Sequence, residues 1–196
     1  MGAVSACRPL TVRLEPPDPL LEDGSIRLVP LGDEHLDGMA GLGRDAETAR
    51  FTYVPVPFDR DAARDWLDRY VRGWQESTLA GFAIEPAAGT GFLGFIALVR
   101  FDADGGQAEI GYLVAAPARG IGVARRALRL VSDWCLYGLG LRRIELRIDV
   151  ENVPSVRVAE RLGYVREGVL RSVHLKQGLR IDQAVYSLLP ADVGLR

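Results

Sequence analysis

Residues 119–124 read RGIGVA and stand between two stretches of different period. Before them, residues 108–114 (AEIGYLV) are rich in β-formers; after them, residues 123–137 repeat apolar side chains every three or four positions. The pattern predicts a strand, a glycine turn and an amphipathic helix in succession. A helix start leaves backbone N–H groups unpaired at the positive end of the dipole, and glycines let an anion approach them. We interpret the loop as a candidate phosphate site, with a plain glycine turn as the alternative.

The rest of the chain predicts a mixed, mostly antiparallel sheet flanked by helices. The alternating stretch 143–150 follows the helix and completes a strand–helix–strand unit. Upstream, short connections rich in glycine and aspartate favour antiparallel hairpins. The other expected strands are 26–29, 81–85, 92–101, 164–170 and 184–189, and the other expected helices start at Asp33, span 59–76 and run from 154 to 162. The predicted fold class is α/β (α+β), with one domain over 25–196 after a loose, proline-rich extension at 1–24.

Composition excludes several classes of protein. The 196 residues, 48% hydrophobic and 26% charged, suit one globular domain. No apolar run approaches the ~20 residues of a membrane-spanning helix, and the start lacks a secretory signal. Cys7 and Cys135 form neither a disulfide framework nor a zinc site, and 24 basic against 26 acidic residues create no field that attracts a polyanion. We expect a cytoplasmic protein with no membrane, metal or nucleic-acid partner.

A dinucleotide-binding module also places a glycine loop between a strand and a helix, and Asp149 after the next strand superficially fits one. The third glycine of that fingerprint would fall at Arg125, however, and a long antiparallel pattern precedes what should be the opening strand. The loop also lacks the lysine that follows a glycine in nucleotide-hydrolysing proteins. Both classes therefore lose their main support.

Three motifs resemble the GCN5-related N-acetyltransferases. Arg119-x-x-Gly122-x-Ala124 matches the Q/R-x-x-G-x-G/A signature of that family. Residues 152–164 (NVPSVRVAERLGY) resemble the N-x-x-S-x-R-x-x-E-x-L-G-F/Y segment of the branch that acetylates ribosomal-protein N-termini, and residues 108–112 (AEIGY) resemble a strand of the same branch. The resemblance covers about residues 25 to 189.

The resemblance implies that strands 108–114 and 143–150 splay apart and that the pantetheine arm of acyl-CoA lies between them. It assigns the backbone of Leu113 and Val114 to pantetheine, and Asn152 and Ser155 to the region near the sulfur. The pyrophosphate is assigned the charge of Arg119 and the N–H groups of the glycine loop, which are those of Gly120, Ile121, Gly122, Val123 and Ala124. Asn152 also suits a helix N-cap, and Ser155 the solvation of that helix start. Acetyl-CoA is the expected cosubstrate, with succinyl-CoA or another acyl-CoA open and no metal required.

The chemistry needs a base, because an ammonium has no lone pair with which to attack a thioester carbonyl. Glu109 is the candidate, since partial burial in an otherwise apolar strand raises a carboxyl pKa and improves it as a base. A solvated strand charge paired with a neighbour is the alternative. Many family members place a tyrosine seven residues after the asparagine, where this chain has Ala159. Ser155, or water, is therefore the candidate that protonates the departing CoA thiolate.

The resemblance implies a primary amine as acceptor. A protein N-terminus is the first choice, and a small amine such as an aminoglycoside or a polyamine stays open. Because first helices and C-terminal strands supply much of the acceptor pocket in this family, Phe51, Tyr53, Trp66 and His174 are candidate lining residues, with ordinary structural places as the alternative. The family also leads us to expect a homodimer. A noncatalytic acyl-CoA sensor is the rival from another class.

Overall fold

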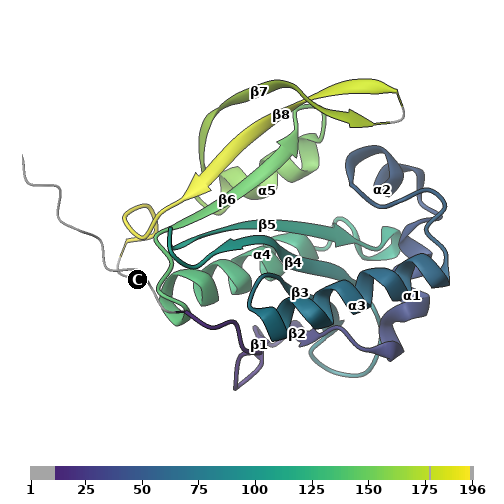
Figure 1. Cartoon of the computed structure of the whole chain (residues 1–196). Helices are drawn as coiled ribbons and strands as arrows, with labels where there is room; N and C mark the ends of the chain where they lie inside the picture. The colour runs from purple at the N-terminus through teal and green to yellow at the C-terminus, as the bar shows by residue number, and fades with distance from the viewer. Residues whose placement is uncertain (1–11, 177, 195–196) are drawn as a thin grey trace, which may run out of the picture.

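The computed structural model describes residues 12–176 and 178–194. Its sheet has eight strands in the order β1-β2-β3-β4-β5-β6-β8-β7 (Figure 1). The strands are β1 (Leu21–Glu22), β2 (Ile26–Pro30), β3 (Ala80–Pro86), β4 (Gly94–Asp102), β5 (Gln107–Val114), β6 (Arg143–Asp149), β7 (Val165–Lys176) and β8 (Leu179–Leu188). Neighbouring strands pair antiparallel, apart from the parallel pair β5 and β6. The predicted mixed, mostly antiparallel sheet is confirmed.

Five α-helices accompany the sheet in the described part of the chain: α1 (Leu36–Leu42), α2 (Ala46–Phe51), α3 (Arg60–Glu76), α4 (Val123–Asp133) and α5 (Val153–Arg161). Helix α3 begins at Asp59, whose side chain accepts a hydrogen bond from the Ala62 N–H at 3.0 Å. Helix α4 continues as a π-helical turn over Trp134–Gly138, so the predicted helix at 123–137 changes its hydrogen bonding near its end. The sequence did not predict α2, because six residues are too few to show a helical period.

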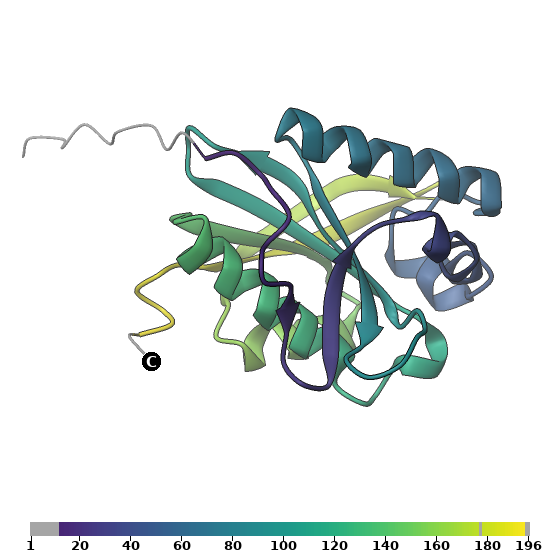
Figure 2. The same cartoon turned by 90° about the horizontal axis from the view of Figure 1, so that it is seen from below.

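The two faces of the sheet are covered by different helices. Figure 2 shows α3 on one side of the sheet and α4 on the other. Successive residues of β4 alternate between the two layers: Ile96 and Leu98 belong to the core on the α4 side, and Phe95 and Ala97 to the core on the α3 side. Burying an α4 side chain such as Leu128 contributes about 1.5–3 kcal/mol, and many such contacts fix the helix against the sheet.

Strands β5 and β6 form a fork. They pair in parallel from Gln107 and Arg143 as far as Glu109 and Glu145. Beyond these residues β5 continues beside β4, and β6 continues beside β8, with no pairing between β5 and β6 themselves. The predicted splay of the central strands is confirmed, and it leaves backbone polar groups of both strands open to a ligand.

The N-terminal segment differs from the loose extension predicted for 1–24. Leu14 is 1% exposed and belongs to the core on the α4 side, and its N–H donates to the Ser77 hydroxyl at 3.1 Å. Strand β1 then pairs with β2. The extension is therefore not loose at these positions, because one buried leucine and one short strand hold it on the domain. Residues 1–11 lie outside the described residues, so that part of the prediction is not tested.

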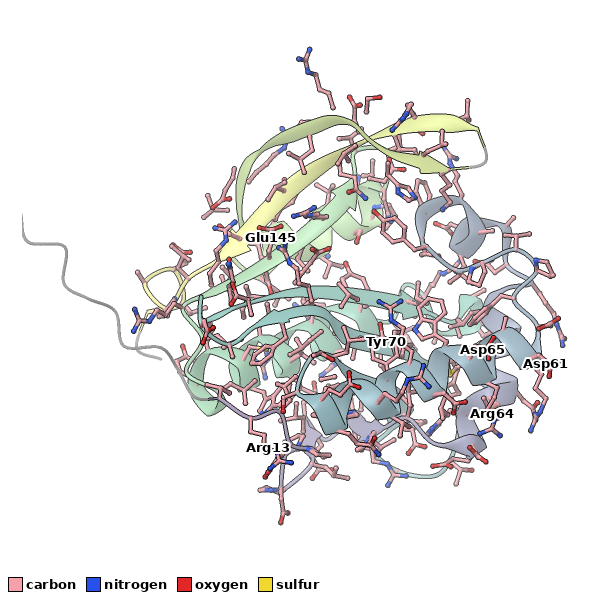
Figure 3. All side chains as sticks on the ribbon, viewed as in Figure 1. Arg13, Asp61, Arg64, Asp65, Tyr70 and Glu145 are labelled. Carbon is pink, nitrogen blue, oxygen red and sulfur yellow. The ribbon has the colours of Figure 1, made fainter. Side chains whose placement is uncertain are left out.

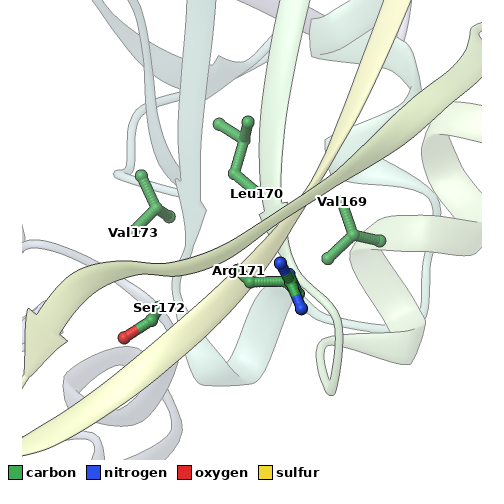
Figure 4. A pocket seen from close by; sticks show the side chains of 5 residues that line it. All are labelled: Val169, Leu170, Arg171, Ser172 and Val173. Carbon is green, nitrogen blue, oxygen red and sulfur yellow. The ribbon is translucent and has the colours of Figure 1, made fainter.

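The C-terminal hairpin is longer than the predicted strands 164–170 and 184–189. Its register shifts along β7 between Leu170 and His174, and Ser172 has a positive φ of 53°. The side chains of residues 169–173 spread around the strand and border an open hollow of about 640 Å³ (Figure 4). Val169, Leu170 and Val173 are all exposed, so this part of β7 lacks the apolar alternation that marks a half-buried strand.

Candidate active site

A cavity of about 1220 Å³ occupies the fork between β5 and β6 and extends toward α2, α3 and the starts of α4 and α5. The residues predicted for the site line it, with the exceptions of Ile121 and the candidate pocket residue His174. Ile121 is 70% exposed and does not line this space, although its backbone belongs to the glycine loop. The fold thus brings the three sequence motifs to one cavity.

The glycine loop forms one end of the cavity. Gly120 and Gly122 have positive φ values of 78° and 89°, a left-handed conformation that favours glycine. A Cβ at Gly120 would meet nothing within 4 Å, and one at Gly122 would approach the Arg126 side chain no closer than 4.0 Å. The glycines are therefore required by backbone conformation and by access to the helix start, and not by packing inside the protein. The first N–H groups of α4 have no acceptor within their own helix and suit an anion.

Three arginines at the same end were missed by the sequence reasoning. Arg125, Arg157 and Arg161 line the cavity, and none of them forms an ion pair with another residue of the described chain. Arg157 and Arg161 are four positions apart on α5 and so share one helix face. This four-residue spacing is the feature of the sequence that could have predicted a positively charged helix face. The unpaired positive charges make this end suitable for several phosphate groups.

Arg119, in contrast, has its guanidinium committed elsewhere. Its Nη1 donates to Glu47 Oε2 at 2.6 Å, and its Nη2 donates to Thr48 Oγ1 at 3.0 Å and to the Asp45 carboxylate. Its Nε donates to the Val114 carbonyl at 3.2 Å. The Arg119 hydrogen bond is the main reason that the pKa of Asp45 falls to about 2. The charge that the resemblance assigned to pyrophosphate is thus neutralised by the start of α2.

Two glutamates face each other across the last paired position of the fork. The Glu109 side chain is 18% exposed and lies 3.5 Å from Arg147 Nε and 3.7 Å from Arg100 Nη2. Burial raises the pKa of Glu109, and the attraction of Arg147 and Arg100 only partly offsets this effect. Glu109 accepts no hydrogen bond from the described residues, so its carboxylate remains available to take a proton.

Glu145, on β6, is bound more closely. Arg147 donates to it at 2.8 Å and Arg143 at 3.0 Å. Burial raises the pKa of Glu145, but these two hydrogen bonds and their charges outweigh it and hold the pKa below its usual range. Figure 3 shows Glu145 on the part of the sheet that lies across the fork from Tyr70 and Asp65 of α3. The two glutamates thus differ in chemistry although they are paired in the sheet.

Ser155 and Asn152 stand where α5 begins. Asn152 Oδ1 accepts a hydrogen bond from the Ser155 N–H at 3.2 Å, which is the N-cap that the sequence suggested. The Ser155 hydroxyl is 2.6 Å from the Tyr112 hydroxyl, across the fork on β5. Burial raises the pKa of Tyr112 to about 12, so its proton is retained at neutral pH. Ala159 is fully buried in the core, and no hydroxyl is present at that position.

The other end of the cavity is lined by aromatic side chains. Phe51, Tyr53 and Trp66 line it as predicted, together with Tyr70 and Phe95. Trp66 and Phe95 pack edge to face with ring centroids 5.9 Å apart, and Tyr70 and Phe95 do so at 5.1 Å. This wall was only partly predicted, because Tyr70 and Phe95 read as ordinary core residues from their helix and strand patterns.

The C-terminal hairpin crosses to this aromatic end. The His174 ring lies edge to face with the Tyr53 ring at a centroid distance of 4.3 Å, and Gln183 donates to the Tyr53 hydroxyl. Lys176 Nζ donates to the Thr52 carbonyl at 2.6 Å. Figure 1 shows the far end of the β7–β8 hairpin beside α2. His174 was a candidate lining residue with an ordinary structural place as the alternative; it does not line the cavity and instead packs against Tyr53, which does.

The described residues show neither a metal-binding cluster nor a membrane-spanning helix. They contain no group of three or more histidine, cysteine, aspartate or glutamate side chains that could hold a metal ion. Within the same residues, none of the helices combines the length and the apolar character needed to cross a membrane.

Comparison with known proteins gives a consistent result. The family described as the acetyltransferase (GNAT) domain matches residues 25–165. The probable N-acetyltransferase YjcK of Bacillus subtilis (strain 168) is 32% identical over 180 residues, which cover 88% of this chain and 98% of YjcK. Spermidine N(1)-acetyltransferase of Escherichia coli (strain K12) is 26% identical over 146 residues, 74% of this chain and 76% of that enzyme.

A solved structure of RimL, a ribosomal L7/L12 alpha-N-protein acetyltransferase in complex with coenzyme A, shares the fold with a TM-score of 0.79 at 17% identity, over 87% of this chain and 97% of RimL. The family match and these relatives indicate the same class of protein. This chain belongs to the acetyltransferase (GNAT) domain family, and it is an acetyltransferase enzyme.

Proposed function

We propose that the protein transfers an acetyl group from acetyl-CoA directly to a primary amine, by attack of the amine on the thioester. The observation that carries the proposal is the cavity in the fork, which joins the glycine loop and three unpaired arginines to Glu109 and to the Tyr112–Ser155 hydroxyl pair. Phosphates at one end and a base and a proton donor at the fork are the groups that this reaction needs.

The cofactor end would hold CoA through backbone and charge. The N–H groups of residues 120–124 would bind the pyrophosphate, and Arg125, Arg157 and Arg161 would balance the phosphate charges. The backbone of Leu113 and Val114 would pair with the pantetheine arm, as an added strand does. The coenzyme A bound to RimL, which shares this fold, supports the same ligand here. No metal is needed for any of these contacts.

Glu109 would act as general base. Its carboxylate would take a proton from the acceptor ammonium, and the freed amine would attack the thioester carbonyl. When the tetrahedral intermediate collapses, the C–S bond breaks and the thiolate leaves. A raised pKa brings the Glu109 carboxylate closer to the pKa of the amine, which favours the proton transfer.

Ser155 would stabilise the departing thiolate. Either hydroxyl of the Tyr112–Ser155 pair can be the donor. In the proposed arrangement Tyr112 donates to the Ser155 oxygen, which would leave the serine proton to donate to the sulfur. The thiolate then gains a proton from Ser155. The second amine proton, lost as the intermediate collapses, would pass through water to the Ser155 oxygen, and Glu109 would release the first proton to solvent. Asn152 would contribute by fixing the start of α5, and so the place of Ser155.

The acceptor is proposed to be a protein N-terminus, with a polyamine as the second choice. The alpha-N-protein activity in the name of RimL supports the first, and the spermidine in the name of the Escherichia coli relative supports the second. The aromatic end of the cavity, lined by Phe51, Tyr53 and Trp66, would receive either acceptor beside the fork.

The test is a screen for CoA release with a thiol reagent, using acetyl-CoA and succinyl-CoA against N-terminal peptides, spermidine and an aminoglycoside. Release without acceptor is subtracted, which also corrects for Cys7 and Cys135. We expect turnover with acetyl-CoA and at least one amine, and its loss in Glu109→Gln. Faster turnover with succinyl-CoA would identify succinyl-CoA, and not acetyl-CoA, as the acyl donor. Tight CoA binding without turnover on any amine would favour the noncatalytic sensor.

We also propose that the protein is cytoplasmic and forms a homodimer. Light scattering would test the homodimer.

A further inference from the structure

We propose that Arg119 is a positioning residue that fixes helix α2 over the aromatic end of the cavity, called the acceptor end from here on. Arg119 is then not a ligand of the cofactor phosphates. The inference rests on the proposed function for its catalytic consequence. Its structural part, the link between the glycine loop and α2, can be tested without turnover.

The contacts of Arg119 connect three parts of the site. Its backbone begins the glycine loop, and its Nε is bonded to the carbonyl of Val114 at the end of β5. The two remaining nitrogens donate to Asp45, Glu47 and Thr48, which are the N-cap and the first turn of α2. A guanidinium has five N–H donors, and four of the available hydrogen bonds are thereby used.

The charges make a direct role in phosphate binding unfavourable. One guanidinium is paired with two carboxylates, so the cluster of Arg119, Asp45 and Glu47 is net negative. A pyrophosphate that recruited Arg119 would have to break both ion pairs and would meet the two freed carboxylates. The unpaired Arg125, Arg157 and Arg161 need no such exchange.

Helix α2 needs an external anchor because it has six residues, too few to be stable alone. Its end leads into the cavity wall, where Phe51 and Tyr53 line the space and Tyr53 is held by His174 and Gln183. Arg119 therefore anchors the start of the segment, and the C-terminal hairpin anchors its end. Release of the start would let this wall of the acceptor end move while the cofactor end keeps its shape.

The experiment compares Arg119→Gln with Asp45→Asn/Glu47→Gln. The second variant keeps an N-cap, since asparagine caps a helix as well as aspartate does, and it leaves Arg119 in place without its charged partners. Arg64→Gln is the matched control, because it removes an exposed ion pair with Asp33 outside the cavity. Hydrogen exchange over residues 44–54, calorimetry with coenzyme A, and the acceptor KM are measured for each protein.

We expect both variants to accelerate exchange over residues 44–54 by about tenfold and the control to leave it unchanged. The Kd for coenzyme A should stay within about threefold, while the KM for an acceptor found in the screen rises about fivefold or more with little change in kcat. Combining all three substitutions should add little further, because each variant breaks the same link.

The inference is overturned if Arg119→Gln weakens coenzyme A binding about tenfold or more while exchange over residues 44–54 is unchanged. It is equally overturned if Asp45→Asn/Glu47→Gln leaves both that exchange and the acceptor KM as in the wild type. If no amine is acetylated at all, the proposed function fails, but exchange and calorimetry still decide the role of Arg119.

Discussion

The two ends of the cavity are built in different ways. The cofactor end consists mainly of one continuous segment, from the end of β5 through the glycine loop to the start of α4, to which one face of α5 is added. The acceptor end is assembled from α2, α3 and the C-terminal hairpin, with contacts between residues as far apart as Tyr53 and Gln183, 130 positions along the chain. Backbone geometry makes the first end, and side chains from distant segments make the second. The first therefore tolerates little change, whereas small substitutions can alter the second.

The largest expected effect is at the cofactor end. Gly122→Glu should lower coenzyme A affinity by about 100-fold or more, because it places a carboxylate at the helix start where phosphate is expected. The fold should survive, since a Cβ at Gly122 has open space around it. Calorimetry measures the affinity, and Gly122→Ala is the control for the strain of a side chain at φ 89°. Equal affinities of the glutamate variant and wild type would remove the phosphates from this loop.

Glu109→Gln should lower kcat by roughly 10²–10⁴ while the Kd for acetyl-CoA changes little. As pH falls, Glu109 becomes protonated and no longer acts as a base, so kcat/KM should decrease on the acidic side of its pH profile. Because the pKa of Glu109 is raised, this decrease should begin at a higher pH than for an ordinary glutamate. The amide variant should lack it. Glu145→Gln is the matched control: it removes the carboxylate that two arginines hold, so its main effect should be on stability.

The acceptor amine also titrates, so acceptors with different amine pKa values are needed to separate its limb from that of Glu109. An acidic limb that follows the acceptor alone, together with near wild-type turnover of Glu109→Gln, would refute the assignment. The amine would then lose its proton to water or to another group.

Ser155→Ala and Tyr112→Phe should each lower kcat by about tenfold with little effect on CoA affinity. The kcat of the double variant should be about the same as that of either single variant. The reason is that both remove the same hydroxyl pair. Asn152→Ala provides the contrast, since loss of an N-cap costs about 1 kcal/mol of stability and should lower Tm. Normal kinetics with a lower Tm for Ser155→Ala would leave the serine a structural role.

The smallest effect is expected at the acceptor end. Tyr53→Phe keeps the ring against His174 but removes the hydroxyl that accepts from Gln183, so the acceptor KM should rise about two- to fivefold with acetyl-CoA Kd unchanged. Tyr137→Phe, on an exposed tyrosine outside the cavity, is the control. A change in acetyl-CoA Kd of the same size would mean that the two ends are not separable.

Much of the fold was predictable because it follows from local periodicity. The β-forming residues of β4, the alternation of β6 and the apolar faces of α3 and α4 mark the buried elements directly. The failures have the opposite cause: β1 and α2 are too short to show a period, the far part of the hairpin has no buried face, and Leu14 is held by contacts that the proline-rich segment around it does not reveal.

The features of the site also fall into those set by local sequence and those set by contacts between distant segments. The sequence by itself determined the glycine loop, the helix starts and the N-cap at Asn152, because these depend on backbone conformation within a few residues. Tertiary structure decided what surrounds them. Arg119 is bound by Asp45, 74 positions away, and Ser155 is joined to Tyr112, 43 positions away. Hydrogen bonds and burial of this kind depend on which distant segments the sheet brings together. The partners of Arg119 and the raised pKa of Glu109 are therefore properties of the folded chain.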